Sequence, residues 1–315
     1  MAYVCHRCGR EGTRGYVAVA EGWACTSFKA CDERVERERV AHGLHRIDYQ
    51  GKNGPSHYYK LDGKRVPGVT TIIKDALPSP FLIDWAARVT ARYAAENLDT
   101  LWGMRHMGTE AIYNVLEHEP RTQRDSAGVR GTKLHIWAEQ MLRGQEAEGI
   151  TNELLPWVLA VRDFLEDFRP KPVLFEAPLA SHRFGGYAGT LDLVGDFPQV
   201  LVGGRPFPAA RRIVDYKSSK RIYSEIALQL GAYRNAEVYL DEEGVERGLA
   251  ELGISEWGLG VLIRPEGYQV RPVYVGEEVL AAFGRVKWMR EFVKRDGQLD
   301  QWLGDPLPPV TKGNA

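Results

Sequence analysis

Two short hydrophobic stretches, each interrupted by a single carboxylate, hold the residues best suited to chemistry. Asp192 and Asp215 each lie between two apolar neighbours, as in a short β-strand. A Pro- and Gly-rich connection over 197–208 separates them, which predicts a hairpin that places the two aspartates side by side. Lys217 follows Asp215 by two residues, so the two side chains share one strand face.

Carboxylates inside apolar strands are costly unless they hold a cation. Hard oxygen ligands favour Mg²⁺ or Mn²⁺, which combine one or two carboxylates with water and substrate phosphate. A lysine beside such a metal can orient or deprotonate the attacking water and offset charge in the transition state of phosphodiester cleavage. The alternative is a structural hairpin in which the aspartate and the lysine form a cross-strand salt bridge.

Two pairs of polar residues at helical spacing extend this set. His135 and Glu139 are four residues apart, as are Gln229 and Tyr233, and such pairs share one face of a helix. Each pair alone is unremarkable, and His135 alone is equally explained as a hydrogen-bonded helix histidine. Together with the two aspartates and the lysine, these residues indicate a functional site more specifically than any one of them does alone.

Four motifs follow one another along the chain: a G-x-x-x-H helix ending at His135, a Gly-Thr-Leu-Asp strand ending at Asp192, an Asp-Tyr-Lys strand ending at Lys217, and a Gln-x-x-x-Tyr helix ending at Tyr233. Their order and spacing resemble the PD-(D/E)XK nuclease superfamily, specifically its RecB-like branch, which includes phage recombination and CRISPR-associated exonucleases. The segment 66–73 also looks like the entry segment of phage members. The resemblance covers about 60–300 of the chain.

The resemblance implies a metal-binding role for three residues. Asp192 and Asp215 would hold the catalytic Mg²⁺ or Mn²⁺, with His135 as an additional ligand. Glu176 lies on the strand before Asp192, where some relatives carry an acidic residue, and a surface position for it is the alternative.

The resemblance also implies the chemistry. Lys217 would be the catalytic lysine, while Gln229 and Tyr233 would support the site and the DNA strand. The function expected is metal-dependent hydrolysis of DNA by an exonuclease of recombination or repair, encoded by a phage and working with a recombination partner protein. Two alternatives remain: a zinc-finger nucleic-acid-binding protein with an inactive nuclease fold, and a nuclease directed at RNA.

All cysteines lie within the first 31 residues, as two pairs separated by a predicted hairpin: Cys5 with Cys8, and Cys25 with Cys31. Two thiolates from each of two turns can build a tetrahedral Cys₄ zinc site, although the second pair is spaced more widely than usual. His6 is a substitute ligand, and an iron–sulfur cluster, free thiols or disulfides are the alternatives. Iron–sulfur members of the RecB-like branch place one cysteine before the nuclease core and three after it. A cluster of that kind cannot form here, which favours a separate zinc module.

The net charge of −1 gives no global sign of a nucleic-acid partner, so contacts to DNA must come from local basic groups. Such groups flank the motifs and are predicted to contact single-stranded DNA or duplex ends through phosphates: Arg130, Lys133, Arg211, Arg212, Lys220 and Arg221.

Composition predicts an ordinary globular chain, with 44% apolar and 26% charged residues. No apolar run is long enough to span a membrane, and the start of the chain lacks a secretory signal pattern, which favours a cytoplasmic protein without a membrane partner. Three regions are expected: a zinc module and charged linker over 1–46, the nuclease domain over 47–302, and a flexible tail over 303–315.

The fold class expected is α/β, with a restriction-endonuclease-like core of a mixed sheet flanked by helices and a helical segment before it. Apolar periodicity and capping residues predict the helices that position the motifs. They lie at 108–118, 126–143 and 222–240, with further helices beginning at Ser79 and Thr151 and a last one over 279–293.

Overall fold

The computed structural model describes residues 2–7, 10–20, 22–27, 29–31, 42–51, 54–77, 80–294 and 302–305. Within these ranges, a seven-stranded sheet has the order β14-β13-β8-β9-β12-β15-β16. β12 and β15 are parallel, whereas the pairs β8–β9, β9–β12 and β15–β16 are antiparallel. The expected mixed α/β fold is confirmed. The strands are β8 (Lys171–Ser181), β9 (Tyr187–Phe197), β12 (Ala210–Lys217), β13 (Val238–Leu240), β14 (Glu246–Gly248), β15 (Trp257–Arg264) and β16 (Gly267–Tyr274).

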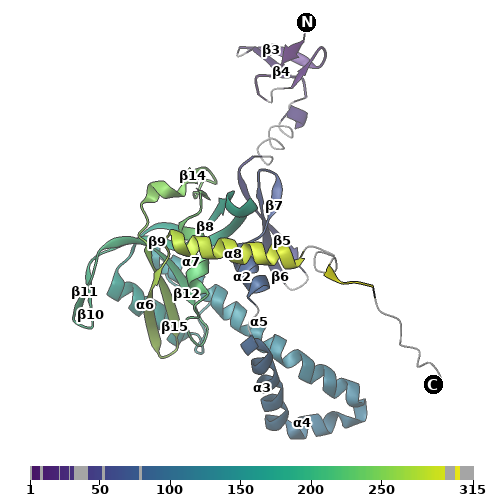
Figure 1. Cartoon of the computed structure of the whole chain (residues 1–315), viewed down its shortest axis with the longest axis vertical. Helices are drawn as coiled ribbons and strands as arrows, with labels where there is room; N and C mark the ends of the chain where they lie inside the picture. The colour runs from purple at the N-terminus through teal and green to yellow at the C-terminus, as the bar shows by residue number, and fades with distance from the viewer. Residues whose placement is uncertain are drawn as a thin grey trace, which may run out of the picture.

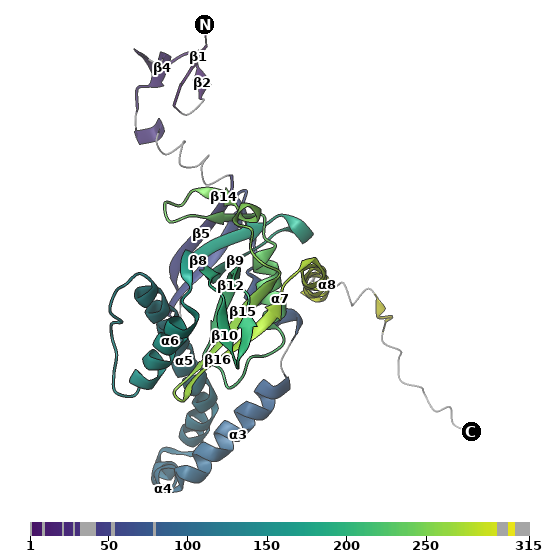
Figure 2. The ribbon, with the colours of Figure 1, turned by 90° about the vertical axis from the view of Figure 1, so that its left-hand side faces the viewer.

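Helices cover both faces of the sheet (Figures 1 and 2). One face packs against α2 (Val69–Ala76), α7 (Ile226–Arg234) and α8 (Glu277–Lys294) in a core that includes Ile72, Leu230 and Phe283. The opposite face packs against α5 (Thr109–Leu142) and α6 (Leu155–Phe168), through side chains such as Trp137 and Phe164. Since both faces are buried, the middle of β9 and of β12 is apolar on both sides of Asp192 and Asp215, with Leu191 and Leu193 in one strand and Val214 and Tyr216 in the other.

The hairpin predicted around the aspartates is present. β9 and β12 pair antiparallel, with Leu193 opposite Val214. Their connection is itself a short hairpin of β10 (Val200–Val202) and β11 (Arg205–Phe207). Gly203 and Gly204 form its turn with φ of 56° and 76°, left-handed values that a two-residue turn of this kind requires at both positions.

A second, three-stranded sheet precedes the main one: β5 (Leu44–Gly51), β6 (Gly54–Leu61) and β7 (Lys64–Val66). Tyr59 and Leu61 bury their side chains against Ala180 and Ala188 of the main sheet. The backbone N–H of Leu44 also donates to the Glu246 carboxylate at 2.8 Å. The domain boundary predicted between 46 and 47 therefore falls inside β5, and this sheet belongs with the main one.

α5 corrects the two-helix prediction for 108–118 and 126–143, because it is one helix of 34 residues that continues through Pro120. An interior proline removes one backbone hydrogen bond and crowds the carbonyl four residues earlier, but the helix continues through the strong helix formers Arg121, Gln123 and Arg124 that follow it. α3 (Pro80–Glu96), α4 (Leu98–Gly103), a 3₁₀ turn and the first half of α5 form an arm that projects from the sheets (Figures 1 and 2).

The predicted helix over 222–240 is shorter than expected, because α7 ends at Arg234 and β13 begins at Val238. β13 starts where the chain must return to pair with β8, so tertiary pairing ends the helix. No helix in the described ranges is long and apolar enough to cross a membrane. Cys8, the helix start at Ser79, linker residues 32–41 and tail residues 306–315 lie outside the described residues.

Candidate functional site

One cavity of about 710 Å³ collects the motif residues. It lies where β8, β9 and β12 meet α5 and α7, and the small sheet and the start of α2 form its opposite wall. Five elements that are distant in sequence each contribute a polar side chain to its floor, and the residues are His135, Glu176, Asp192, Asp215, Lys217 and Gln229.

His135, Glu176 and Asp192 form one compact group. The Nδ1 atom of His135 lies 3.2 Å from Oε1 of Glu176 and 3.4 Å from Oδ1 of Asp192. The other oxygen of Asp192 accepts a 2.8 Å hydrogen bond from the backbone N–H of Tyr216. One ligand atom from each of the three lies within 4.8 Å of the others, so the group could hold a metal ion.

Glu176 has an unusual backbone conformation in β8. Its φ is 36°, a left-handed value that a residue with a side chain adopts at a cost of about 1–3 kcal/mol. The residues before and after it, Phe175 and Ala177, pair regularly with Leu193 and Leu191 of β9. The distortion is thus confined to the position that carries the carboxylate, and of the two placements considered for Glu176, the structure has the one in the site.

Asp215, Lys217 and Gln229 form a second group beside the first. The Gln229 amide donates to Oδ1 of Asp215 at 2.6 Å, and the Lys217 ammonium donates to Oε1 of Gln229 at 3.1 Å. Nζ of Lys217 also lies 2.6 Å from Oδ2 of Asp215, at ion-pair distance. This buried oxygen is thus paired with the ammonium group of the lysine.

Burial and mutual charge shift the pKa of these groups in opposite directions. Burial and the nearby charge of Asp192 raise the pKa of Asp215 to about 6, although Lys217 opposes the shift. Burial also raises the pKa of Asp192, but the charge and hydrogen bond of His135 outweigh it, and the net shift is downward. Burial lowers the pKa of His135, yet Asp192 and Glu176 raise it well above its ordinary value. The metal-free site therefore holds protons that a bound cation would displace.

Tyr233, the last residue of the Gln-x-x-x-Tyr motif, is almost wholly buried at 3% exposure and lines the cavity. Its ring lies directly over Gly189 of β9, where a Cβ atom would stand 2.4 Å from Cε1 of the ring. The glycine of the Gly-Thr-Leu-Asp motif is therefore required by the tyrosine of the helix motif. The two motifs look independent in the sequence, but in the structure they are joined by the packing of Tyr233 on Gly189.

Gly189→Ala should destabilise the chain by about 1–3 kcal/mol, the usual cost of forcing a methyl group into a packed core. It should also weaken cleavage, because the ring can move only by disturbing α7 and Gln229. Thermal melts and cleavage rates measure the two effects, with Gly103→Ala as a control at an open position whose φ of −60° any residue can adopt. A Gly189→Ala protein with unchanged stability would contradict the contact.

A hydrogen-bonded wall faces the metal-binding groups, and the sequence motifs did not point to it. The Tyr59 hydroxyl lies 2.8 Å from the Thr190 hydroxyl and 3.0 Å from Nε2 of His57. Arg46 donates to the same threonine at 3.2 Å. Thr190 follows Gly189 in β9 and lines the cavity. These hydrogen bonds therefore attach the three-stranded sheet to the main sheet within the site. Burial and then the charge of Arg46 lower the pKa of His57.

The basic residues predicted to contact DNA divide into two classes. Arg212 is buried at 3% exposure and donates to the backbone carbonyls of Trp257 and Pro208, which contradicts a role in DNA contact. Arg211 forms a two-point ion pair with Asp196 and donates to the Leu252 carbonyl, so its charge is already used within the fold. Both residues face elements of the protein because β12 is a central strand.

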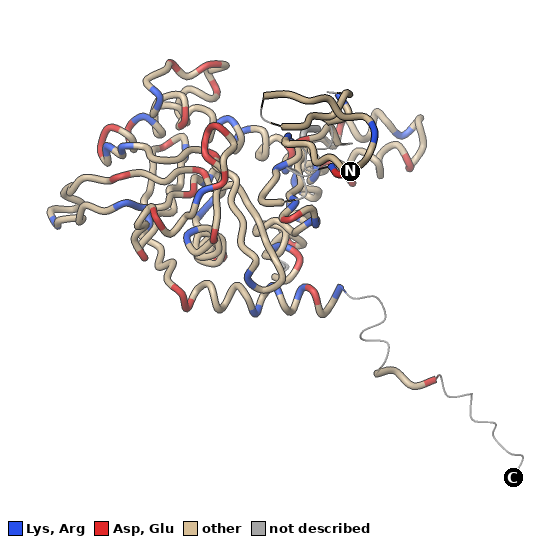
Figure 3. Tube along the Cα trace, turned by 90° about the horizontal axis from the view of Figure 1, so that it is seen from above, with Lys and Arg blue, Asp and Glu red and all other residues tan. Residues whose placement is uncertain are grey.

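The other four basic residues lie nearer the cavity. Arg130 is half-buried with its guanidinium 4.8 Å from the centre of the Trp157 ring, while Lys133 is half-buried two residues before His135. Lys220 and Arg221 are exposed on the loop that follows Lys217. Positive and negative side chains are otherwise interspersed over the chain (Figure 3).

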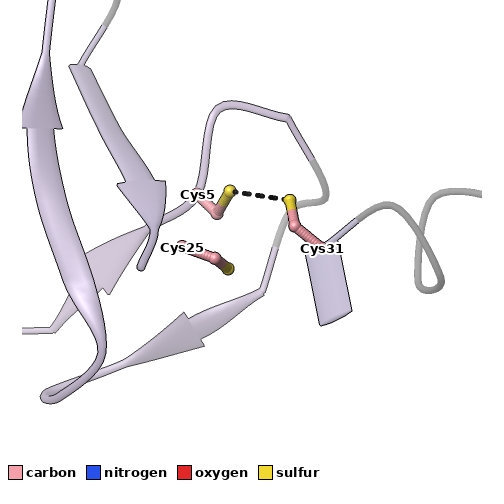
Figure 4. A group of neighbouring side chains, drawn as sticks. All are labelled: Cys5, Cys25 and Cys31. Atoms are coloured by element: carbon pink, nitrogen blue, oxygen red, sulfur yellow. Dashed lines mark hydrogen bonds between the residues drawn. The ribbon is translucent and has the colours of Figure 1, made fainter. Parts of the chain in front are cut away.

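The N-terminal cysteines form a separate group on a module of β1 (Tyr3–Val4), β2 (Glu11–Gly12), β3 (Tyr16–Val19) and β4 (Gly22–Cys25). Cys5, Cys25 and Cys31 are buried, with their sulfur atoms within 4.8 Å of one another (Figure 4). The Cys5 and Cys31 sulfurs are 3.7 Å apart. That is close to the ~3.8 Å edge of a tetrahedron with ~2.3 Å zinc–sulfur bonds and far from the ~2.05 Å of a disulfide. This group too could hold a metal.

A scan against protein-family models finds no match to this chain, and a search of curated proteins finds no matching sequence.

Proposed function

We propose that this chain is a metal-dependent DNA nuclease with a PD-(D/E)XK core. The observation that carries the proposal is the convergence of the four motifs: His135, Asp192, Asp215, Lys217 and Gln229 come from four elements and line one cavity. A hairpin stabilised only by a salt bridge would need neither the helix histidine nor the glutamine beside it.

The donor set fits Mg²⁺ or Mn²⁺. Carboxylate oxygens with one imidazole suit a hard divalent cation, and part of its coordination shell is left for water and phosphate. Oδ2 of Asp215 is buried and already pairs with the Lys217 ammonium at 2.6 Å, so a metal ion bound by Asp215 would share this carboxylate with the lysine. His135, Glu176 and Asp192 would hold the ion, because their ligand atoms lie within 4.8 Å of one another. Asp215 lies outside this group and would be the additional ligand that the resemblance implies. When bound, the ion would activate water and stabilise charge on the phosphate oxygens.

Lys217 would act on the water and on the phosphate. Gln229 and Asp215 fix the ammonium from two sides, so it needs little reorganisation as charge develops. In that position it can orient the attacking water and offset the negative charge of the transition state. The phosphate backbone would approach from the side of Lys133, Lys220 and Arg221, with salt-sensitive binding.

An exonuclease of DNA recombination or repair, encoded by a phage and acting with a recombination protein, is the specific form of the proposal. End-labelled linear DNA, a closed circular single strand and an RNA of the same sequence test it in Mg²⁺ and in Mn²⁺. The proposal expects cleavage of the linear DNA from one end and resistance of the circle. Cleavage of RNA alone would establish the RNA-directed alternative, and binding without cleavage in any metal would establish an inactive nuclease fold.

We infer that the N-terminal cysteines hold a structural zinc ion. Elemental analysis after anaerobic purification should give one zinc per chain and no iron. Cys25→Ser should lose the zinc while metal-dependent cleavage remains, because the cysteine module and the cavity are built from separate residues. Stoichiometric iron and sulfide with a visible charge-transfer band would contradict the zinc assignment.

A further inference from the structure

An exposed cluster of two aromatic rings and a guanidinium lies where the helical arm meets the sheets. Phe81, in the first turn of α3, is 60% exposed, and Tyr223 is 42% exposed. The guanidinium of Arg221 lies between them, 5.9 Å from the centre of the Phe81 ring and 4.9 Å from that of Tyr223. Two segments that are about 140 residues apart in the sequence thus build one surface.

This cluster is attached to the proposed catalytic strand. The loop 218–225 begins directly after Lys217, so Arg221 stands within about 14 Å of it along the chain. Buried Ile222 anchors the loop under the sheet beside Gly260, and the Ser219 hydroxyl donates to the Arg221 carbonyl at 2.7 Å. The loop is therefore held in place, with Arg221 and Tyr223 displayed on either side of the anchor.

The positive charge of the loop indicates which class of ligand would bind there. The loop 218–225 carries Lys220 and Arg221 against the single carboxylate of Glu225, and Lys217 directly precedes it. Exposed rings interleaved with cations suit a polyanion that also offers flat aromatic faces. An unpaired nucleotide offers both, whereas the bases of a duplex are already stacked on one another. A protein partner would need acidic side chains here to match the same cations.

We propose that Phe81, Arg221 and Tyr223 form a stacking platform for unpaired nucleotides of the DNA strand whose backbone enters the cavity. The proposal rests on the nuclease function proposed above, and it names the substrate class of that site as DNA with a single-stranded segment. Four residues of chain set an upper limit of about 14 Å between Lys217 and Arg221, so the platform would contact nucleotides close to the one bound in the cavity.

Binding of fluorescent oligothymidylate, measured by anisotropy in EDTA, tests the platform without requiring cleavage. An abasic strand of equal length keeps every phosphate and removes every base. The full-length protein should bind the base-bearing strand about fivefold to hundredfold more tightly than the abasic strand. Phe81→Ala/Tyr223→Ala should remove this preference. Ile83→Ala is the matched control, because it removes exposed apolar surface from the same turn of α3 but no ring.

Arg221→Gln should weaken binding of both strands, because a positive charge is lost, and should weaken binding of the base-bearing strand more, because the guanidinium belongs to the platform. Equal binding of the base-bearing and abasic strands by the unaltered protein would overturn the platform, as would a preference that survives in the double variant. The proposed function is tested separately, by cleavage in Mn²⁺. A protein that prefers bases but cleaves nothing would support the platform and overturn the nuclease, and one that cleaves without the preference would do the reverse.

Discussion

Lys217→Ala should slow DNA cleavage by at least about a hundredfold, because groups that position water or offset transition-state charge typically contribute 10²–10⁴-fold. The ammonium is held by Gln229 and Asp215 inside the cavity, and its side chain is only 32% exposed. Removing it leaves His135, Glu176 and Asp192 in place, so metal binding and DNA affinity should change little. Single-turnover rates at saturating DNA measure the chemical step directly.

Two further variants isolate the charge of the lysine. Lys217→Met keeps most of the hydrophobic stem and should be as slow as the alanine variant. Lys171→Ala removes an exposed lysine at the start of β8, outside the cavity, and should cleave at the unaltered rate. Full activity in both Lys217 variants would make the ion pair with Asp215 purely structural.

Asp215→Asn should abolish cleavage altogether. The amide keeps the shape of the carboxylate but removes the charge that would hold the cation. DNA binding should survive or strengthen, since one negative charge facing the phosphate is lost. Calorimetric titration with Mn²⁺ should show a large loss of affinity.

Stability distinguishes this effect from misfolding. The pKa of Asp215 is raised in the folded chain, so ionisation of this carboxyl lowers the free energy of unfolding. This destabilisation is complete above a pH of about 6 and absent below the unfolded pKa of about 3.9. The neutral variant should therefore melt no lower than the unaltered protein at neutral pH without metal. Asp196→Asn, at the far end of the same strand pair, is the control that should keep both cleavage and Mn²⁺ binding. A variant at Asp215 that cleaves normally would refute the site.

Much of the site could be predicted because local chemistry and local geometry agree there. The period of two along a strand places Lys217 on the face of Asp215, and the Gly-rich connection leads β9 back beside β12. Helical spacing placed Gln229 on the face of α7 that meets them. Each of these inferences needs only a few consecutive residues.

The rest depends on contacts across the fold. The sequence does not show that Glu176 adopts a left-handed conformation, since nothing in its neighbours requires one. Arg211 and Arg212 were expected to contact DNA because the sequence does not show their partners. Asp196 is distant from Arg211 along the chain, and the partner of Arg212 is the backbone carbonyl of Trp257. The two helices predicted over 108–118 and 126–143 are one helix, α5, which continues through Pro120. The hydrogen-bonded wall around Tyr59 corresponds to no sequence motif. Its position beside the cavity is visible only once the small sheet is in place.

The most direct test of a metal-dependent nuclease centre in this cavity is the rate of phosphodiester cleavage as Mn²⁺ is titrated into the unaltered protein, Asp192→Asn and Asp196→Asn, all purified identically. Cleavage should appear with the metal, disappear in excess EDTA, persist in Asp196→Asn and be absent in Asp192→Asn. Equal cleavage by Asp192→Asn and the unaltered protein, or no cleavage by the unaltered protein at any Mn²⁺ concentration, would contradict the assignment.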